Sequence, residues 1–345
     1  MNSLPEQSRR PNVDDLVSFL LCPEGEHPHL ECRLTAFACS ELEALDPYLK
    51  VHAGDGWVEG KTLHNLTLRE DSWRTMWPAR VAARLLLVER ESGNASWRDV
   101  LRTRPTPLQQ HPFEMPPDGV RNVVISAGFL DVELTRPYHP VIAGSRLSCE
   151  APDLGRISEL TDRYRAAITL LKKYDTKGYS VFANSASAIV PLQVDPPLEP
   201  GKCVSLAIAS APGVVLLTMV PIILLSETLL HESSHCRLNA LESLAKLWVS
   251  GATRVASPLR PDPRPISGLY HQAYVLFWLA RFYGRLREAE QEPSAERNRR
   301  QVDKRREELT NGFRAAITTL RENRSELTPL GVRVVEEMAS IGEVP

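Results

Sequence analysis

The chain lacks the features that mark small secreted proteins, nucleic-acid-binding proteins and exported proteins. Six cysteines among 345 residues are too sparse for a disulfide scaffold, so we expect a reducing, cytoplasmic setting. Basic residues do not exceed acidic ones, and a formal charge of -2 argues against a nucleic-acid partner. Residues 1–12 are polar, and no apolar signal core follows them at signal-peptide length.

One stretch, residues 213–230, is very apolar. It is interrupted by Thr218, Pro221, Ser226 and Glu227, and a polar helix pattern continues directly from it. We therefore predict a buried strand followed by a buried helix, and no membrane partner.

The patterning along the chain predicts an α+β fold that is predominantly helical, with a small sheet packed against a metal-binding helix pair. We expect an amino-terminal mixed α/β region at 1–150, with a candidate role in substrate binding, and a metal-binding catalytic domain at 151–345. Helices are predicted at residues 13–21, 40–50, 72–91 and 157–173. Strands are predicted at residues 122–125, 130–134, 180–182, 188–192, 204–209 and 214–217. The charged residues 295–308 indicate a solvated helix face.

The strongest functional feature is the motif His231-Glu232-Ser233-Ser234-His235. Residues four apart on a helix differ by about 40° of rotation, so His231 and His235 project side by side and can bind one metal ion. Glu232, the candidate catalytic residue, lies beside them and can reach a metal-bound water. Three fixed residues also recur by chance, but leucines at three-residue spacing follow the motif and predict a helix over residues 221–248.

A catalytic metal site needs a third protein ligand and an open coordination position. A metzincin would place glycine and histidine at positions where this chain has leucine. A thermolysin-like peptidase would supply a glutamate from a following helix, but none occurs between Glu242 and Glu288. Glu242 is on the motif helix, two turns beyond His235, and we expect it to point away. His271 is our choice of third ligand, and the alternative is a core histidine satisfied by structural hydrogen bonds.

Three segments resemble a known family. These are residues 213–217 (GVVLL), residues 224–235 (LLSETLLHESSH) and residues 262–271 (DPRPISGLYH). They are similar to the strand, the metal helix and the downstream ligand segment of bacterial HExxH-motif proteins that modify ribosomally synthesised peptides. That family is described as 2-oxoglutarate-dependent peptide β-hydroxylases. The resemblance covers roughly residues 157–339 and is specific in the last two segments.

The resemblance implies that His231, His235 and His271 bind Fe(II). Three open positions would then take 2-oxoglutarate and O2. It also implies a reaction in which 2-oxoglutarate is oxidised to succinate and carbon dioxide while a β-carbon of the precursor peptide gains a hydroxyl group. Three neutral imidazoles leave the ion dicationic, and the dianionic cosubstrate neutralises it.

The distal carboxylate of 2-oxoglutarate then needs a cation, and arginine offers a planar bidentate one. Residues 257–265 are predicted to form a stiff loop because prolines alternate along it, and this loop displays Arg264 and Arg260. We rank Arg264 first, Arg260 second and Arg281 third.

Two other functions are consistent with the same residues. In a zinc peptidase the histidines would hold Zn and Glu232 would act as general base for a bound water. In a non-catalytic peptide-binding protein the metal would be structural, which requires a fourth nearby ligand. The sequence does not predict the oligomeric state.

Overall fold

The computed structural model describes residues 12–25, 29–30, 33–34, 36–37, 110–112, 122–124, 146–148, 154–186, 188–195, 203–207, 213–250, 252–258, 260–289 and 296–342. The described chain is predominantly helical with a small mixed sheet, which confirms the predicted α+β class. It divides into two compact units. The first comprises Met1–Arg33, Ile168–Asn184 and Leu229–Pro345, and the second comprises Leu34–Ala167 and Ser185–Thr228. Neither unit ends at residue 150, and most residues around that predicted boundary are not described.

The sheet belongs to the second unit and has the strand order β1-β2-β4-β7-β6. Its central strands, β2 (Asn122–Val124), β4 (Ala188–Pro191) and β7 (Val214–Leu217), are parallel. The antiparallel strands β1 (Gln110–Pro112) and β6 (Ser205–Ala207) pair at its edges. All four residues of β7 are buried, as expected for a continuous apolar run in a parallel pair. A separate antiparallel pair joins β3 (Arg146–Ser148) to β5 (Gln193–Asp195).

The helix that carries the HExxH motif is α9 (Ile222–Leu244). Pro221 immediately precedes it, and its carbonyl accepts the backbone N–H of Leu225 at 2.8 Å. A proline costs little at this end because the first helical amides lack partners inside the helix. The predicted leucine stripe is confirmed in part, since Leu238 and Leu241 are fully buried, whereas Leu244 is half-buried.

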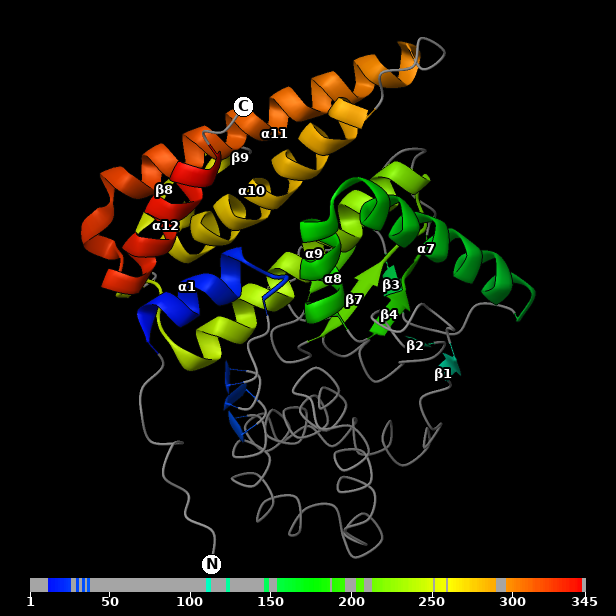
Figure 1. The fold of residues 1–345 in the computed structure, drawn as a ribbon, viewed down its shortest axis with the longest axis horizontal. Coiled ribbons are helices and arrows are strands. Elements are labelled where there is room, and N and C mark those ends of the chain that lie inside the picture. The colour runs from blue at the N-terminus through cyan, green and yellow to red at the C-terminus, as the bar shows by residue number, and fades with distance from the viewer. Residues whose placement is uncertain are drawn as a thin grey trace, which may run out of the picture. The chain divides into compact units, whose positions relative to one another are not determined.

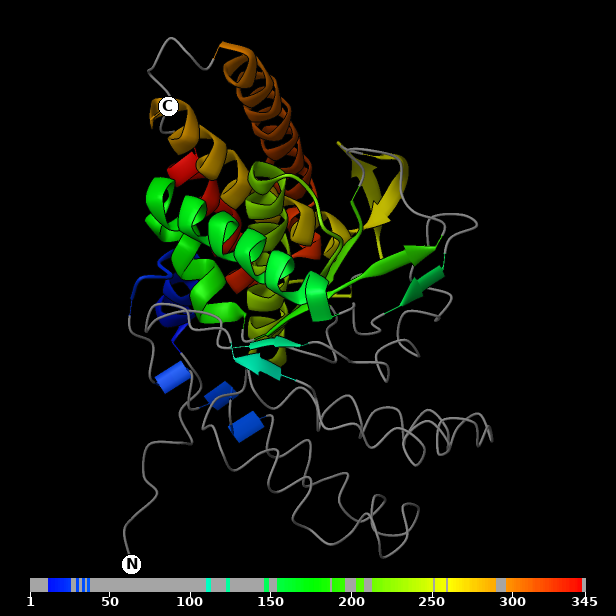
Figure 2. The same cartoon turned by 90° about the vertical axis from the view of Figure 1, so that its right-hand side faces the viewer.

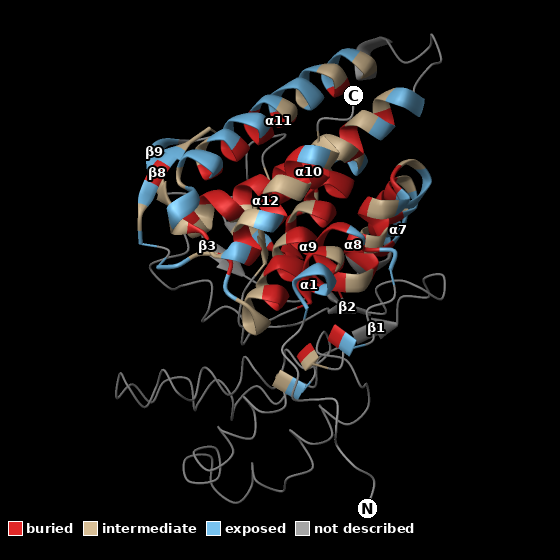
Figure 3. Ribbon diagram, turned by 60° about the vertical axis from the view of Figure 1, so that its left-hand side comes forward, coloured by how far each residue is buried: buried red, intermediate tan, exposed pale blue. Residues whose placement is uncertain are grey.

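The first unit is built from long helices. Here α10 (Ile266–Ala289) packs against α11 (Glu296–Glu322), and α12 (Pro329–Gly342) contacts both. Figures 1 and 2 show α10 and α11 running side by side, with α1 (Val13–Leu21) close to α12. Most of α9 and α10 is buried (Figure 3), which follows from apolar residues around much of their circumference.

The proline- and arginine-rich segment is a strand rather than the predicted loop. It forms β9 (Arg260–Pro265), which pairs antiparallel with β8 (Arg254–Ser257), with an irregularity between Val255 and Ser257. Proline is tolerated because both strands of a two-stranded ribbon are edges, where some amides face solvent. The expectation that the prolines hold this segment extended agrees with the strand.

The predicted strand at residues 180–182 is wrong, because these residues lie in α8 (Thr176–Ser185). Asp175 separates this helix from α7 (Leu154–Tyr174), and an aspartate immediately before a helix favours its initiation over the strand preference of Val181 and Phe182. Two predicted helices, at residues 40–50 and 72–91, and a strand at 130–134 lie outside the described residues. Within the described chain, no helix combines the length and the apolar character needed to cross a membrane.

Candidate metal centre

The two motif histidines lie on the same face of α9. The ring centroids of His231 and His235 are 5.0 Å apart. With Glu232, they form a group whose potential ligand atoms lie within 4.8 Å of one another. The predicted helical spacing therefore brings both imidazoles to one place.

His271 comes from the second turn of α10 and contacts His235, although it is not a member of the group formed by His231, Glu232 and His235. Its Nδ1 atom lies 3.0 Å from Nδ1 of His235, and the two rings stack with centroids 5.2 Å apart. Two nitrogen ligands about 2.1 Å from one ion are separated by about 3.0–3.4 Å. The His235–His271 pair therefore fits a shared metal ion. Without a metal, the same contact is a hydrogen bond in which one Nδ1 carries the proton.

Glu242 does not point away, contrary to the prediction. Its Oε1 atom lies 2.7 Å from Nε2 of His271. Eleven residues advance a helix by about three turns, which returns Glu242 to within about 20° of His231. The spacing of residues 231, 235 and 242 contains this signal, because the helical period alone places Glu242 on the side of the motif histidines.

The contact with Glu242 selects one tautomer of His271. When Nε2–H donates to the carboxylate, a neutral His271 has its lone pair on Nδ1, the atom that faces His235. A carboxylate in this position also makes the imidazole a stronger ligand and fixes the orientation of its ring.

Glu232 is buried next to the histidines. Its side chain is 4% exposed, and Oε1 lies 3.8 Å from Nε2 of His231, which is 40% exposed. The Glu232 carboxylate therefore lies at the cluster, as the motif predicts. It can act either as a general base or as a hydrogen-bond partner of a metal-ligating histidine.

The electrostatics keep His235 neutral. Burial lowers the pKa of His235 well below its ordinary value, and electrostatic interactions with His231, His271 and Arg264 lower it further. A neutral imidazole is the form that binds a metal, so this environment favours ligation at neutral pH.

Arg264 lies beside this cluster, whereas Arg281 does not. The Arg264 Nε and Cζ atoms would be 3.4 Å and 3.5 Å from a Cβ at Gly268, so the guanidinium lies over the first turn of α10, where a glycine leaves room. Arg281 donates from Nε to Asp175 at 3.1 Å, and it is about 15 Å along the helix from His271. Arg260 begins β9, but its side chain lies outside the described part of the chain.

An aromatic wall adjoins His271. The Trp248 ring lies 6.1 Å from the His271 ring and 5.8 Å from that of Tyr270. Burial raises the pKa of Tyr270 well above its ordinary value, and the Glu242 charge adds to this effect. The protonated Tyr270 hydroxyl donates to the carbonyl of Gly331 at 3.0 Å, which ties this wall to α12.

No protein-family model and no curated protein matches the chain. The resemblance to HExxH-motif peptide hydroxylases therefore rests on the motif segments of the sequence alone.

Proposed function

We propose that the chain is an Fe(II)- and 2-oxoglutarate-dependent hydroxylase that acts on a β-carbon in a ribosomally synthesised precursor peptide. The donor set suits this metal, because three neutral imidazoles leave coordination positions for a cosubstrate. When bound, Fe(II) with 2-oxoglutarate and O2 supplies the oxidation of an unactivated C–H bond, with succinate and carbon dioxide as coproducts.

The observation that carries the proposal is the position of Arg264 near His235, which contacts His271 and lies beside His231. Arg264 is close enough to His235 to contribute to the lowering of its pKa. A dicarboxylate such as 2-oxoglutarate could therefore place one carboxylate at the metal and the other in a bidentate contact with the Arg264 guanidinium.

The remaining side chains have defined tasks in this proposal. Glu242 would hold His271 with Nδ1 toward the metal, and the Trp248 ring lies against the His271 ring. Glu232 hydrogen-bonds a ligand or a bound water.

A zinc peptidase is the second candidate because Glu232 is buried at the cluster, where it would serve as general base for a bound water. Metal content alone separates the two candidates poorly, since zinc outcompetes Fe(II) at most nitrogen sites.

The test is to incubate the full chain and a precursor peptide from the same organism with Fe(II) and 2-oxoglutarate, under oxygen and under argon. We expect a gain of one oxygen atom in the peptide, coupled to succinate and dependent on O2. Arg264→Ala should raise the 2-oxoglutarate requirement by about tenfold or more without weakening metal binding, in keeping with the loss of a charge-assisted contact. Arg254→Ala, an exposed arginine on the same hairpin, is the control.

Two outcomes would reject the hydroxylase. Cleavage that needs metal but neither O2 nor 2-oxoglutarate, and that disappears in Glu232→Gln, would establish the peptidase. Peptide binding without either product would establish a non-catalytic module.

A further inference from the structure

A second candidate site lies between α10 and α11, away from the histidine cluster. A cavity of about 230 Å³ is lined by α10, α11 and the end of α12. Its floor includes Phe277 and Phe313, whose ring centroids are 5.8 Å apart, and Ile341 adds to the apolar surface. Its walls carry four arginines, described below, and Glu288 is the one acid among the lining residues.

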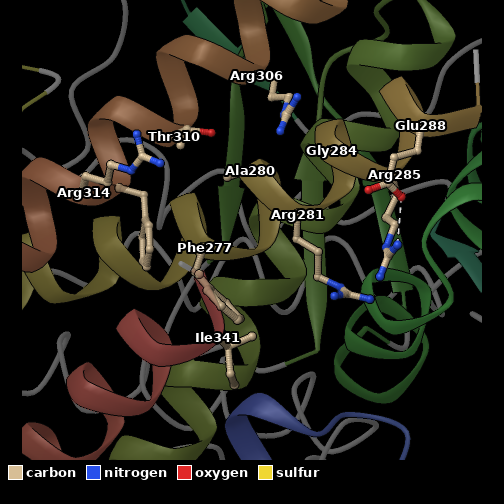
Figure 4. A pocket seen from close by; sticks show the side chains of 12 residues that line it. Phe277, Ala280, Arg281, Gly284, Arg285, Glu288, Arg306, Thr310, Arg314 and Ile341 are labelled. Carbon is tan, nitrogen blue, oxygen red and sulfur yellow. Dashed lines mark hydrogen bonds and ion pairs between the residues drawn. The ribbon is translucent and has the colours of Figure 1, made fainter. Parts of the chain in front are cut away.

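Two of these arginines already have acidic partners. Arg281 pairs with Asp175 at 3.1 Å, and Arg285 pairs with Glu288 at 2.8 Å, as drawn in Figure 4 for the second pair. Their charges are therefore largely compensated within the protein.

Arg306 and Arg314 are different. They project from α11 on the opposite wall, with Thr310 between them (Figure 4). Both are exposed, and among the described residues neither guanidinium has an ion-pair partner. Two acids of α11 pair with other residues, since Asp303 pairs with Arg287 on α10 and Glu308 is contacted by Lys304 and Arg305. Arg306 and Arg314 therefore bring two positive charges, without an ion pair to a described residue, to the cavity.

We propose that this groove, defined by Phe277, Arg306, Thr310, Phe313, Arg314 and Ile341, binds an acidic segment of the peptide substrate. The proposal rests on the proposed function for the identity of that peptide. Arg306 and Arg314 are eight residues apart, which is about 12 Å along the helix. A single phosphate cannot contact both, whereas carboxylates about four residues apart in an extended chain can.

The apolar floor adds the second element of recognition. An apolar side chain between two acidic ones would lie over the cavity, where the burial of its surface adds to the charge-assisted contacts. Phe277 and Phe313 are only 4% and 5% exposed, so a base of a nucleic acid has no ring face to stack on, whereas an aliphatic side chain needs only the space of the cavity. Residues 295–308 were predicted to form a solvated helix face, and in this proposal one of them, Arg306, contacts the peptide.

The test uses fluorescence anisotropy with the full chain and a short labelled peptide that contains glutamate and leucine. A peptide with glutamine in place of glutamate is the control probe. The probe places its glutamates four residues apart with a leucine midway between them and serine at the other positions, so that all three side chains lie on one face of an extended chain. We expect the acidic peptide to bind, the neutral one not to bind, and added salt to weaken the complex. Arg306→Gln combined with Arg314→Gln should weaken binding by about tenfold, the sum of two exposed ion pairs.

The matched control protein combines Arg324→Gln with Arg333→Gln, which removes the same charge from exposed residues outside the groove. Equal binding by the groove variant and the control variant would overturn the proposal. So would a groove-dependent binding of vesicles of phosphatidylglycerol and phosphatidylcholine without binding of the acidic peptide, which would make the surface a membrane contact.

The test is independent of the metal centre because it is done with metal-free protein and repeated with His231→Ala. Groove-dependent peptide binding without any oxygenated product would keep the groove and reject the hydroxylase. Hydroxylation that proceeds equally well in the groove variant would support the hydroxylase and reject the groove as the peptide-binding site.

Discussion

At the scale of single residues, the contact between Glu242 and His271 fixes the orientation of a proposed metal ligand. The carboxylate accepts the Nε2 proton at 2.7 Å, so the Nδ1 lone pair faces His235. We expect Glu242→Gln to weaken metal binding by about tenfold, and Glu242→Ala by up to about 100-fold, because the imidazole loses basicity and orientation. Titration with Co(II) against a competing chelator measures this directly, without any turnover.

The control for this prediction is Glu336→Gln, which removes a carboxylate that pairs with Arg321 at 2.7 Å on another surface. Its metal affinity should equal that of the unmodified chain. If both glutamine variants bind metal as tightly as the original, Glu242 is a neighbour of His271 and does not position it.

At the scale of elements, the wall beside His271 depends on a close approach between α12 and the segment after α9. A Cβ at Gly331 would collide with the carbonyl oxygen of Leu247. That carbonyl accepts the Thr328 amide at 3.1 Å, and Trp248 forms a bridge with Leu327. We expect Gly331→Ala to cost about 1–3 kcal/mol of unfolding free energy, because the backbone on both sides must move apart.

Gly284 provides the matched comparison in urea unfolding experiments. It lies within α10, and a Cβ there would meet nothing within 4 Å. Gly284→Ala should therefore stabilise the protein by up to about 1 kcal/mol through helix propensity. Equal effects of the two substitutions would show that the approach of Gly331 to Leu247 is not needed.

Local sequence patterns predicted individual helices and strands better than they predicted the tertiary contacts between them. Apolar periodicity identified α1, α7 and α9 because each buries one face or more, and alternation of turn signals identified β4 and β7. The contact between His235 and His271 follows from tertiary packing of α9 against α10, which no local pattern encodes. The prediction that Glu242 points away failed for another reason. The 3.6-residue period of the helix is a local pattern, and it already places Glu242 on the same face as the histidines.

At the scale of the whole molecule, the candidate metal centre lies entirely within one of the two compact units. All its residues fall between His231 and His271, in the segment Leu229–Pro345. The acidic-peptide groove belongs to the same segment. A catalytic region after residue 151 was predicted because the motifs cluster there. Residues 1–33 and 168–184 also belong to this unit, and their place in it depends on tertiary contacts. One such contact is the hydrogen bond from the Tyr274 hydroxyl to the Leu20 carbonyl at 2.9 Å.

Global stability should depend on pH through Asp175, a carboxyl group in the same unit. Its side chain is 0% exposed, and burial raises its pKa above the ordinary value of 3.8, although Arg281 and the Gly178 amide oppose this. As the pH rises above 3.8, the unfolded chain releases this proton while the folded chain retains it. The contribution of Asp175 to the unfolding free energy is therefore largest below pH 3.8, and it decreases as the pH rises toward the folded pKa.

Asp175→Asn isolates this effect, because asparagine remains a good residue at the start of α8 but does not titrate. We expect the difference in unfolding free energy, original minus variant, to fall as the pH is raised from about 3.5 to 7 in urea unfolding experiments, with a slope of at most about 1.4 kcal/mol per pH unit. A difference that rises with pH would mean that Arg281 outweighs burial and holds the folded pKa below 3.8, which would contradict the raised pKa. A difference independent of pH would mean that Asp175 titrates alike in the folded and unfolded chains.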